Sequence, residues 1–94
     1  MKYSNEDEVR TMTVSIDHPT GKANFTVVTV GSLELAFSYR TVVGFRDGFE
    51  GWILSENLWG PTTGRHLNAL PGERISRGDF DAKLNALLAR IESP

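Results

Sequence analysis

The chain has 94 residues, of which 39% are hydrophobic and 23% charged, with ten Lys and Arg against twelve Asp and Glu. These values predict a single globular domain over residues 1–94, with residues 1–10 as a flexible lead-in, and they exclude disordered and membrane-spanning compositions. The small negative charge disfavours a dedicated nucleic-acid binder, because phosphate neutralisation normally needs a basic excess. A DNA mimic would need a large acidic excess. Any nucleic-acid site must therefore be a local basic patch.

The absence of cysteine excludes disulfides, thiolate nucleophiles and Cys-ligated metal sites. The two histidines, His18 and His66, belong to no metal-binding spacing, so no metal and no cofactor is predicted. The N-terminal residues lack the apolar run of a signal peptide, and no segment approaches the length of a membrane span. We therefore expect a cytoplasmic protein without a membrane partner.

Period-two alternation begins at Thr11 and predicts a first strand that ends at the turn formers of "DHPTGK". The run "ANFTVVTV" completes a hairpin over residues 11–30. After the break at Gly31 and Ser32, "LELAFSYRTVVGFR" predicts one long strand over residues 33–46. Its length favours a bend or bulge at residues 41–44. One face of this strand would carry the larger apolar side chains, namely Leu33, Leu35, Phe37, Tyr39, Thr41, Val43 and Phe45.

The segment "RDGFEG" predicts a loop before a fourth strand in "WILSEN". The C-terminal segment 76–91 then shows a single apolar helical stripe, with Ser76 and Asp79 at the spacing of a capping box. The predicted fold is therefore α+β: an antiparallel sheet of about four strands, one face covered by the C-terminal helix, and a short helix between them. The stripe consists of Phe80, Leu84, Leu87, Leu88 and Ile91.

The segment "WGPTTGRHLN", from Trp59 to Asn68, allows two interpretations. In one, Pro61 starts a helix with Thr62 or Thr63 as N-cap, and the threonines and Arg65 converge on a phosphate or carboxylate. In the other, which we favour, the segment only begins a short helix that docks Leu67 and Leu70 on the core.

Candidate binding residues lie in this segment and on the long strand, and none is assigned a catalytic role. Because the sequence predicts no nucleophile beside His66, a structural or partner-contact role is favoured for this residue over a catalytic one. Arg40, Arg46 and Arg65, with nearby aromatic residues, could form a basic surface for single-stranded nucleic acid, although a solvated sheet face is the simpler interpretation. The full set of candidates is Arg40, Arg46, Trp59, Thr62, Thr63, Arg65, His66 and Asn68.

Two stretches, "FSYRTVVGFR" and "SENLWGPTTGRHLN", resemble a group of small uncharacterised phage and prophage proteins. The shared pattern is F-S-Y-x-T-x-V-x-F-R followed by T-T-x-x-H-L-N, and it covers about a third of the chain. No activity is established for that group, so the resemblance carries over no catalytic residue. It implies a phage context, in which small proteins often occlude a surface of a host machine.

The sequence therefore predicts a non-enzymatic, phage-derived protein-binding module that inhibits or modulates a host or defence complex, in the manner of an anti-CRISPR-type inhibitor. Such an interface needs about 800 Å² per partner, which a domain of this size can present. The alternative is a small nucleic-acid-binding module with a local basic and aromatic patch. An enzyme acting on an anion near Thr62, Thr63, Arg65 and His66 is the least favoured hypothesis.

Overall fold

The computed structural model describes residues 14–48 and 50–92, with side chains described as far as residue 90. Six strands and two helices follow one another in this part of the chain. They are β1 (Val14–Asp17), β2 (Phe25–Val30), β3 (Leu33–Ser38), β4 (Thr41–Asp47), β5 (Trp52–Ser55), α1 (Pro61–Asn68), β6 (Gly72–Ile75) and α2 (Arg77–Glu92).

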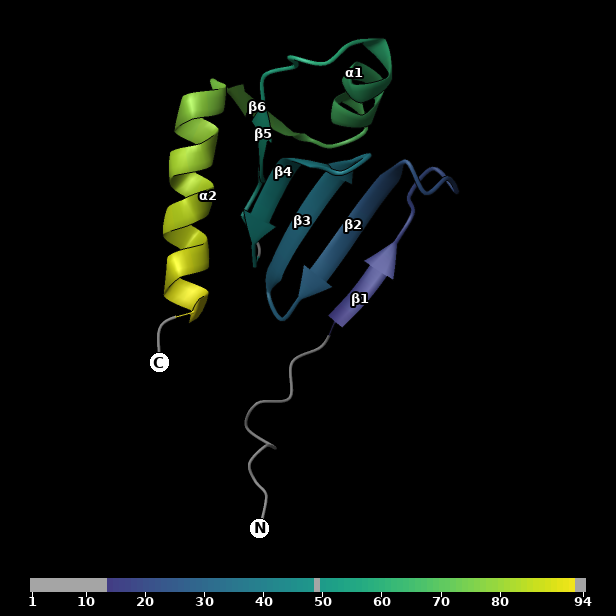
Figure 1. Cartoon of the computed structure of the whole chain (residues 1–94). Coiled ribbons are helices and arrows are strands. Elements are labelled where there is room, and N and C mark those ends of the chain that lie inside the picture. The colour runs from purple at the N-terminus through teal and green to yellow at the C-terminus, as the bar shows by residue number, and fades with distance from the viewer. Residues whose placement is uncertain (1–13, 49, 93–94) are drawn as a thin grey trace.

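The strands form one sheet in the order β1-β2-β3-β4-β5-β6. Neighbours from β1 to β5 pair antiparallel, whereas β6 pairs parallel with β5 after the crossover through α1. Figure 1 shows α2 beside β4 and β5, whereas β2 and β1 lie further from it across the sheet. The α+β class with a C-terminal helix is confirmed, but the prediction of about four antiparallel strands was wrong.

The predicted long strand over residues 33–46 is two strands joined at Tyr39 and Arg40. Ser38 pairs with Thr41 across this turn, and Tyr39 adopts the left-handed backbone region with φ 57. The predicted bulge is present. Val43 is the additional residue of β4, because Ala36 pairs with Gly44 while the next residue of β3 pairs with Val42.

The turn and the bulge each exchange the faces to which alternate residues point. Val43 was predicted on the face of Leu33 and Phe45, but it packs in the cluster on the opposite face. Phe45 nevertheless lies on the same face as Leu33, as predicted. The turn reverses the alternation of faces and the bulge reverses it again, so residues after the bulge point to the predicted faces.

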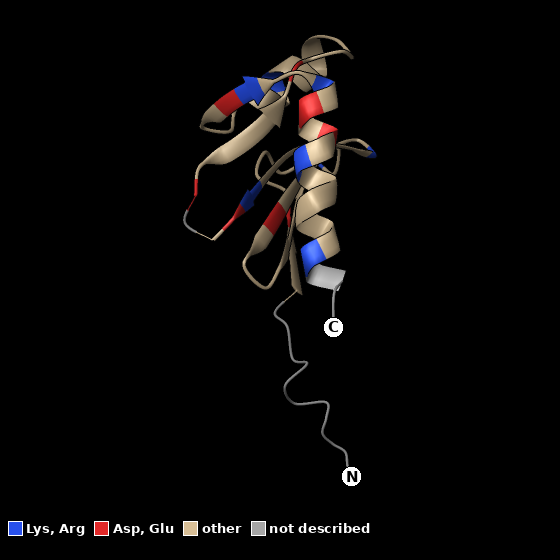
Figure 2. Cartoon of the chain, turned by 90° about the vertical axis from the view of Figure 1, so that its left-hand side faces the viewer, with Lys and Arg blue, Asp and Glu red and all other residues tan. Residues whose placement is uncertain are grey.

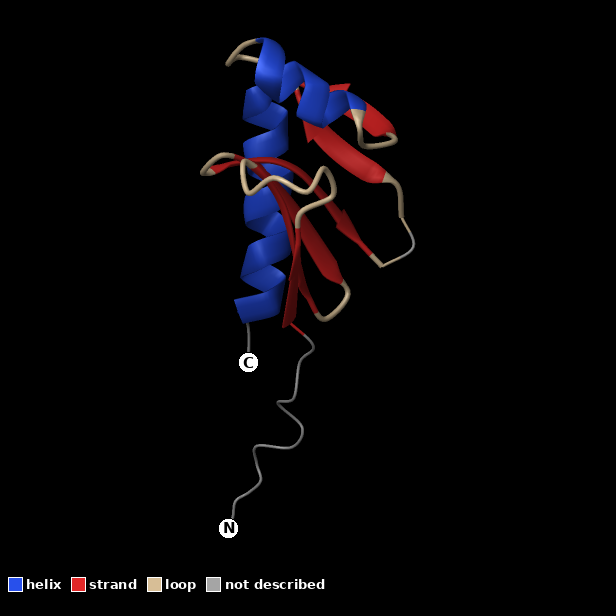
Figure 3. Cartoon of the chain, turned by 90° about the vertical axis from the view of Figure 1, so that its right-hand side faces the viewer, coloured by secondary structure: helices blue, strands red, loops and turns tan. Residues whose placement is uncertain are grey.

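Each face of the sheet therefore carries its own core cluster. The cluster under α1 comprises Phe25, Ala36, Val43, Trp52, Leu54 and Leu67. The cluster under α2 comprises Leu33, Phe45, Phe80, Leu84 and Leu87, and Leu88 packs against it. Figure 3, which views the chain from the β1 side, shows α2 alongside the sheet and α1 at one end of it. Ile91, the last residue of the predicted stripe, lies outside the described side chains.

Residues 57–60 prepare the start of α1 without a side-chain cap from a threonine. The helix begins at Pro61 with Gly60 as N-cap, so neither Thr62 nor Thr63 is the N-cap that the less favoured anion-site interpretation required. Asn57 holds the turn instead, because its Oδ1 accepts from the N–H groups of Trp59 at 3.0 Å and Gly60 at 3.2 Å. The side chains of Thr62 and Thr63 are consequently free to face other partners.

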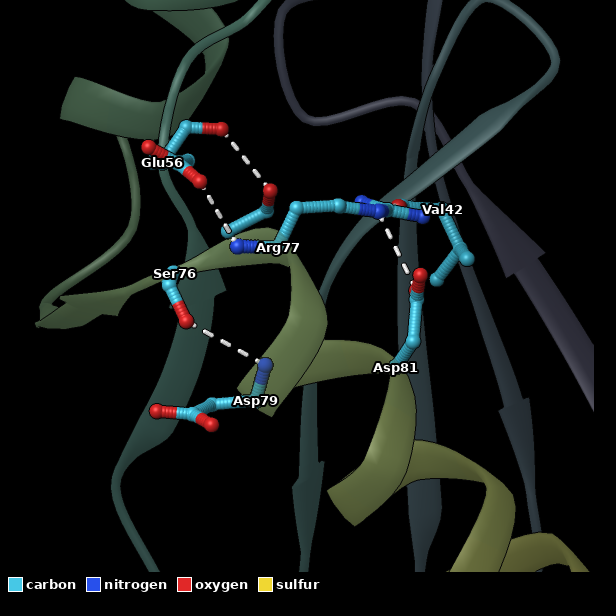
Figure 4. Close-up of polar contacts among 7 residues, drawn as sticks. Val42, Glu56, Ser76, Arg77, Asp79 and Asp81 are labelled. Atoms are coloured by element: carbon cyan, nitrogen blue, oxygen red, sulfur yellow. Dashed lines mark hydrogen bonds and ion pairs between the residues drawn. The ribbon is translucent and has the colours of Figure 1, made fainter.

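The start of α2 is capped as predicted: the N–H of Asp79 donates to Ser76 Oγ at 3.2 Å (Figure 4). The side chain of Arg77 fastens this turn to the sheet. It donates to the carbonyl of Val42 at 2.9 Å and pairs with Asp81 at 3.1 Å, while its backbone N–H donates to Glu56 at 2.8 Å.

No helix in residues 14–48 and 50–92 is long and apolar enough to cross a bilayer.

Candidate functional site

Three buried polar side chains meet between the end of β3 and α1. Ser38 Oγ lies 2.8 Å from Thr63 Oγ1 and 2.8 Å from His66 Nδ1. These residues are 2%, 5% and 5% exposed, respectively. Because buried polar groups are costly unless they are paired, this trio forms a mutually satisfied network inside the protein.

The local structure explains why the trio assembles. Thr63 and His66 are three residues apart and therefore share one side of α1. Ser38 shares a face of β3 with Ala36, whose small side chain is fully buried beneath the helix. The ring of Phe25 stacks on the imidazole with centroids 4.7 Å apart and planes 4° from parallel. The position and the plane of the imidazole are thus both fixed.

Burial lowers the pKa of His66 below its ordinary value of 6.5, and the nearby Arg65 charge lowers it further. The ring is therefore neutral at pH 7 and carries one N–H. If Thr63 donates to Ser38 and Ser38 donates to Nδ1, the proton is on Nε2, which becomes a donor. The reverse order places the proton on Nδ1 and leaves a lone pair on Nε2.

A pocket of about 330 Å³ adjoins His66. The loop between β1 and β2 supplies one wall and α1 supplies the other, and the lining residues are Thr20, Lys22, Asn24, Thr62, Arg65 and His66. Two of these side chains are cationic, and none is a carboxylate. Within the described part of the chain, no hydrogen-bond partner contacts Nε2 of His66, whereas Nδ1 is occupied by Ser38.

Two other hollows, of about 280 and 440 Å³, lie along α2 and the loop between β4 and β5. Their walls mix carboxylates with cations, as Glu50 and Lys83 do in both. Figure 2 shows the same interspersion of charges on this side of the molecule. The pocket beside His66 is therefore the better candidate for binding a charged ligand.

The structure brings together four of the predicted binding residues. Thr62, Arg65 and His66 line the pocket, and Thr63 lies behind it in the buried trio. Arg65 donates to Thr62 Oγ1 at 3.3 Å, which links the two side chains on the surface of α1.

The other four predicted residues lie outside this pocket. Asn68 Oδ1 accepts from Arg74 at 2.6 Å and thereby links α1 to β6. Trp59 is 43% exposed, with the Arg77 guanidinium 5.3 Å from its ring centre. Arg40 is exposed in the turn between β3 and β4.

Arg46 is near the opposite end of β4 from Arg40, paired with Glu34 and lying over the Trp52 ring at 5.1 Å. Arg40 and Arg46 therefore do not share one patch.

Sequence reasoning missed Ser38, Phe25 and the wall that contains Lys22. The serine lies in the quoted "FSYRTVVGFR" stretch, but nothing in one sequence pairs it with a helix far along the chain. The turn at Tyr39 also supports this wall, because its N–H donates to the carbonyl of Asn24 at 2.8 Å. Among the described residues, Oδ1 of Asn24 is the buried side-chain polar atom without a partner.

The model of a family of unknown function (DUF8033) matches residues 3–84 of the chain. No curated protein and no solved structure gives a significant match.

Proposed function

Since this chain belongs to the DUF8033 family, whose function is unknown, we propose that it is a non-enzymatic binding module that docks on a protein of a host or defence complex. The resemblance of two of its stretches to phage and prophage proteins supports such a context. An anti-CRISPR-type inhibitor in the host cytoplasm is the specific form of this proposal. The surface that carries it is the exposed part of the sheet that neither of the described helices covers.

This exposed surface is apolar. Val14 and Ile16 of β1 are 62% and 66% exposed, although both are large hydrophobic residues. They pair with Val30 and Val28 of β2, which places all four side chains on one face. That face continues to Leu33, which is buried under α2. Contiguous exposed apolar surface of this kind typically marks an interaction site.

The edge of β1 defines the kind of partner. Within the described sheet, β1 has β2 on one side and no strand on the other. An unpaired strand edge is a template for a further strand, whose backbone supplies hydrogen bonds and whose alternate side chains supply specificity. The partner that fits is therefore an extended segment of another protein with apolar residues at alternate positions.

The candidate site supports binding rather than nucleophilic catalysis. The hydroxyl in contact with His66 belongs to Ser38, which is 2% exposed and out of reach of a substrate. The Thr63 hydroxyl is similarly enclosed at 5%. In this arrangement the hydroxyls position the imidazole and do not attack a ligand.

The deciding experiment compares three versions of the full chain as bait in a bacterial host lysate. The partner identified with the wild type is purified, and its affinity for each version is measured by calorimetry. We expect Ile16→Asp to abolish binding, because the charge enters the apolar row. Ser15→Asp adds the same charge at the neighbouring position, which points to the other face, and should retain binding.

Equal affinity of the Ile16→Asp variant would contradict the proposed surface. Concentration-dependent dimerisation of the purified wild type, lost in Ile16→Asp, would show that a second copy occupies the face instead. Nucleic acid retained on the bait and released at moderate salt would favour the alternative, a small nucleic-acid-binding module.

A further inference from the structure

The pocket beside His66 has a chemistry that the apolar face of β1 and β2 lacks. It combines two cationic side chains, Lys22 and Arg65, with the hydroxyl groups of Thr20 and Thr62. The wall contains no carboxylate to neutralise the cations, in contrast to the hollows along α2. A cationic pocket without an internal counter-ion favours a negatively charged ligand.

His66 supplies an independent observation that points to a ligand. The residue is 5% exposed, yet it lines the pocket. Ser38 and the stacked Phe25 ring fix its orientation, and in the described residues nothing bonds to Nε2. A nitrogen of a pocket-lining residue that is held rigidly and has no protein partner among the described residues is arranged to meet a group that enters the pocket.

We propose that this pocket binds a phosphate group, either as free phosphate or as the terminal group of a small phosphomonoester. A phosphate presents several acceptor oxygens to the guanidinium, the ammonium, the imidazole Nε2–H and the hydroxyls, whereas a carboxylate presents two. With a volume of about 330 Å³, the pocket is at the lower end of the range of small-molecule sites, roughly 300–1,000 Å³.

Bound phosphate also selects one of the two possible arrangements of donors and acceptors in the buried trio. Nε2 must then donate, so Nδ1 accepts from Ser38 and Ser38 accepts from Thr63. Ser38 and Thr63 thus position the imidazole for the ligand without touching the ligand themselves.

The test is nuclear magnetic resonance titration of the full wild-type chain with inorganic phosphate, glycerol 3-phosphate and acetate, each at constant ionic strength. We expect saturable shifts of the His66 imidazole and Arg65 side-chain signals with the two phosphates, and weaker binding of acetate. Comparing the two phosphates distinguishes a free-phosphate site from a monoester site. Either preference supports the proposal.

Arg65→Gln should weaken phosphate binding about tenfold or more, because a charge-assisted hydrogen bond is lost. The arginine is exposed, so this variant should fold normally. Arg40→Gln is the matched control, since it removes an equal charge from a nearby turn outside the pocket, and its affinity should remain within twofold.

Absence of saturable binding, equal affinity for acetate, or equal weakening by Arg40→Gln would each overturn the proposal. These results are independent of the experiment on Ile16, which concerns a different surface.

Discussion

Under α2 the buried core cluster is apolar, and Arg77 bonds to the sheet at the start of the helix, whereas under α1 the apolar cluster is joined by a buried polar trio. On the first side, the Phe45 and Phe80 rings lie 5.2 Å apart within an entirely apolar cluster. On the second, Leu67 packs on the core while Ser38, Thr63 and His66 bond beside it. Apolar contacts are non-directional, whereas hydrogen bonds require one register. The α2 side therefore contributes mainly stability, and the α1 side contributes a fixed geometry.

The largest effect is expected on the apolar side. Phe80→Ala should reduce the free energy of unfolding by about 3–5 kcal/mol, because a fully buried ring is replaced by a cavity. Leu84→Ala should cost about 2–5 kcal/mol for the same reason. Urea denaturation measures both losses. Asn85→Ala, at an exposed position of α2, is the control, and a loss below about 1 kcal/mol for Phe80→Ala would contradict the importance of this cluster.

The next effect concerns the hydroxyl that joins the trio. Ser38→Ala should cost about 1–3 kcal/mol, because it leaves Nδ1 of His66 and the Thr63 hydroxyl buried without their shared partner. The imidazole resonances should also broaden as the ring loses its orientation. Ser32→Ala removes an exposed serine that bonds to Asp47 and should change stability much less. Equal losses for the two variants would show that the trio has no special role.

A smaller effect is expected for Thr63→Val, which preserves shape but removes one hydrogen bond. The free energy of unfolding should fall by about 0.5–1.5 kcal/mol. In a double-mutant cycle with Ser38→Ala, the two losses should not add, because both variants break the same bond. Thr62→Val, whose hydroxyl accepts from the exposed Arg65 side chain, is the control. Strict additivity would argue against a coupled network.

The smallest expected effect is the change of folding stability with pH that His66 causes on the α1 side. Folding lowers the pKa of His66 below 6.5, so the unfolded chain binds its proton more readily than the folded chain. The stability contributed by the neutral ring is therefore present above pH 6.5 and is lost as the pH falls below it. Burial lowers this pKa most, and the positive charge of Arg65 lowers it further.

Melting curves of the wild type and His66→Gln between neutral and mildly acidic pH measure this difference. The wild type should lose stability more steeply than the variant as the pH falls. His18→Gln controls for the removal of a histidine at an exposed site. Parallel curves for wild type and His66→Gln would show that His66 does not titrate differently in the two states.

Local patterns were sufficient to predict the elements that depend on neighbouring residues. The apolar stripe and Ser76 predicted α2, and the turn formers after Asp17 predicted the first hairpin. The sequence predicted one long strand instead of two because the turn at Tyr39 contains neither glycine nor asparagine, although the backbone of Tyr39 is left-handed. The bulge at Val43 then restored the predicted alternation of buried and exposed faces, so the apolar residues before the turn and after the bulge follow one continuous period of two.

The parallel strand β6 could not be predicted from its own residues. The four residues "GERI" are largely exposed and have no strand periodicity. They form a strand because β5 offers a free edge, and because Gly72 allows close approach: a Cβ there would lie 2.3 Å from the carbonyl oxygen of Trp52. For the candidate site, the sequence identified Arg65 and His66 on α1. The partners from β3 and the first loop required the tertiary structure.

The two walls of the His66 pocket differ in how freely their residues can be exchanged. His66 is constrained by a stacked ring and a hydrogen bond, so replacing it disturbs the core. Thr20 and Lys22 instead belong to an exposed surface loop, where substitutions and changes of length are usually tolerated. Related chains could therefore acquire new ligand preferences by altering this loop alone, with the imidazole retained as a common anchor.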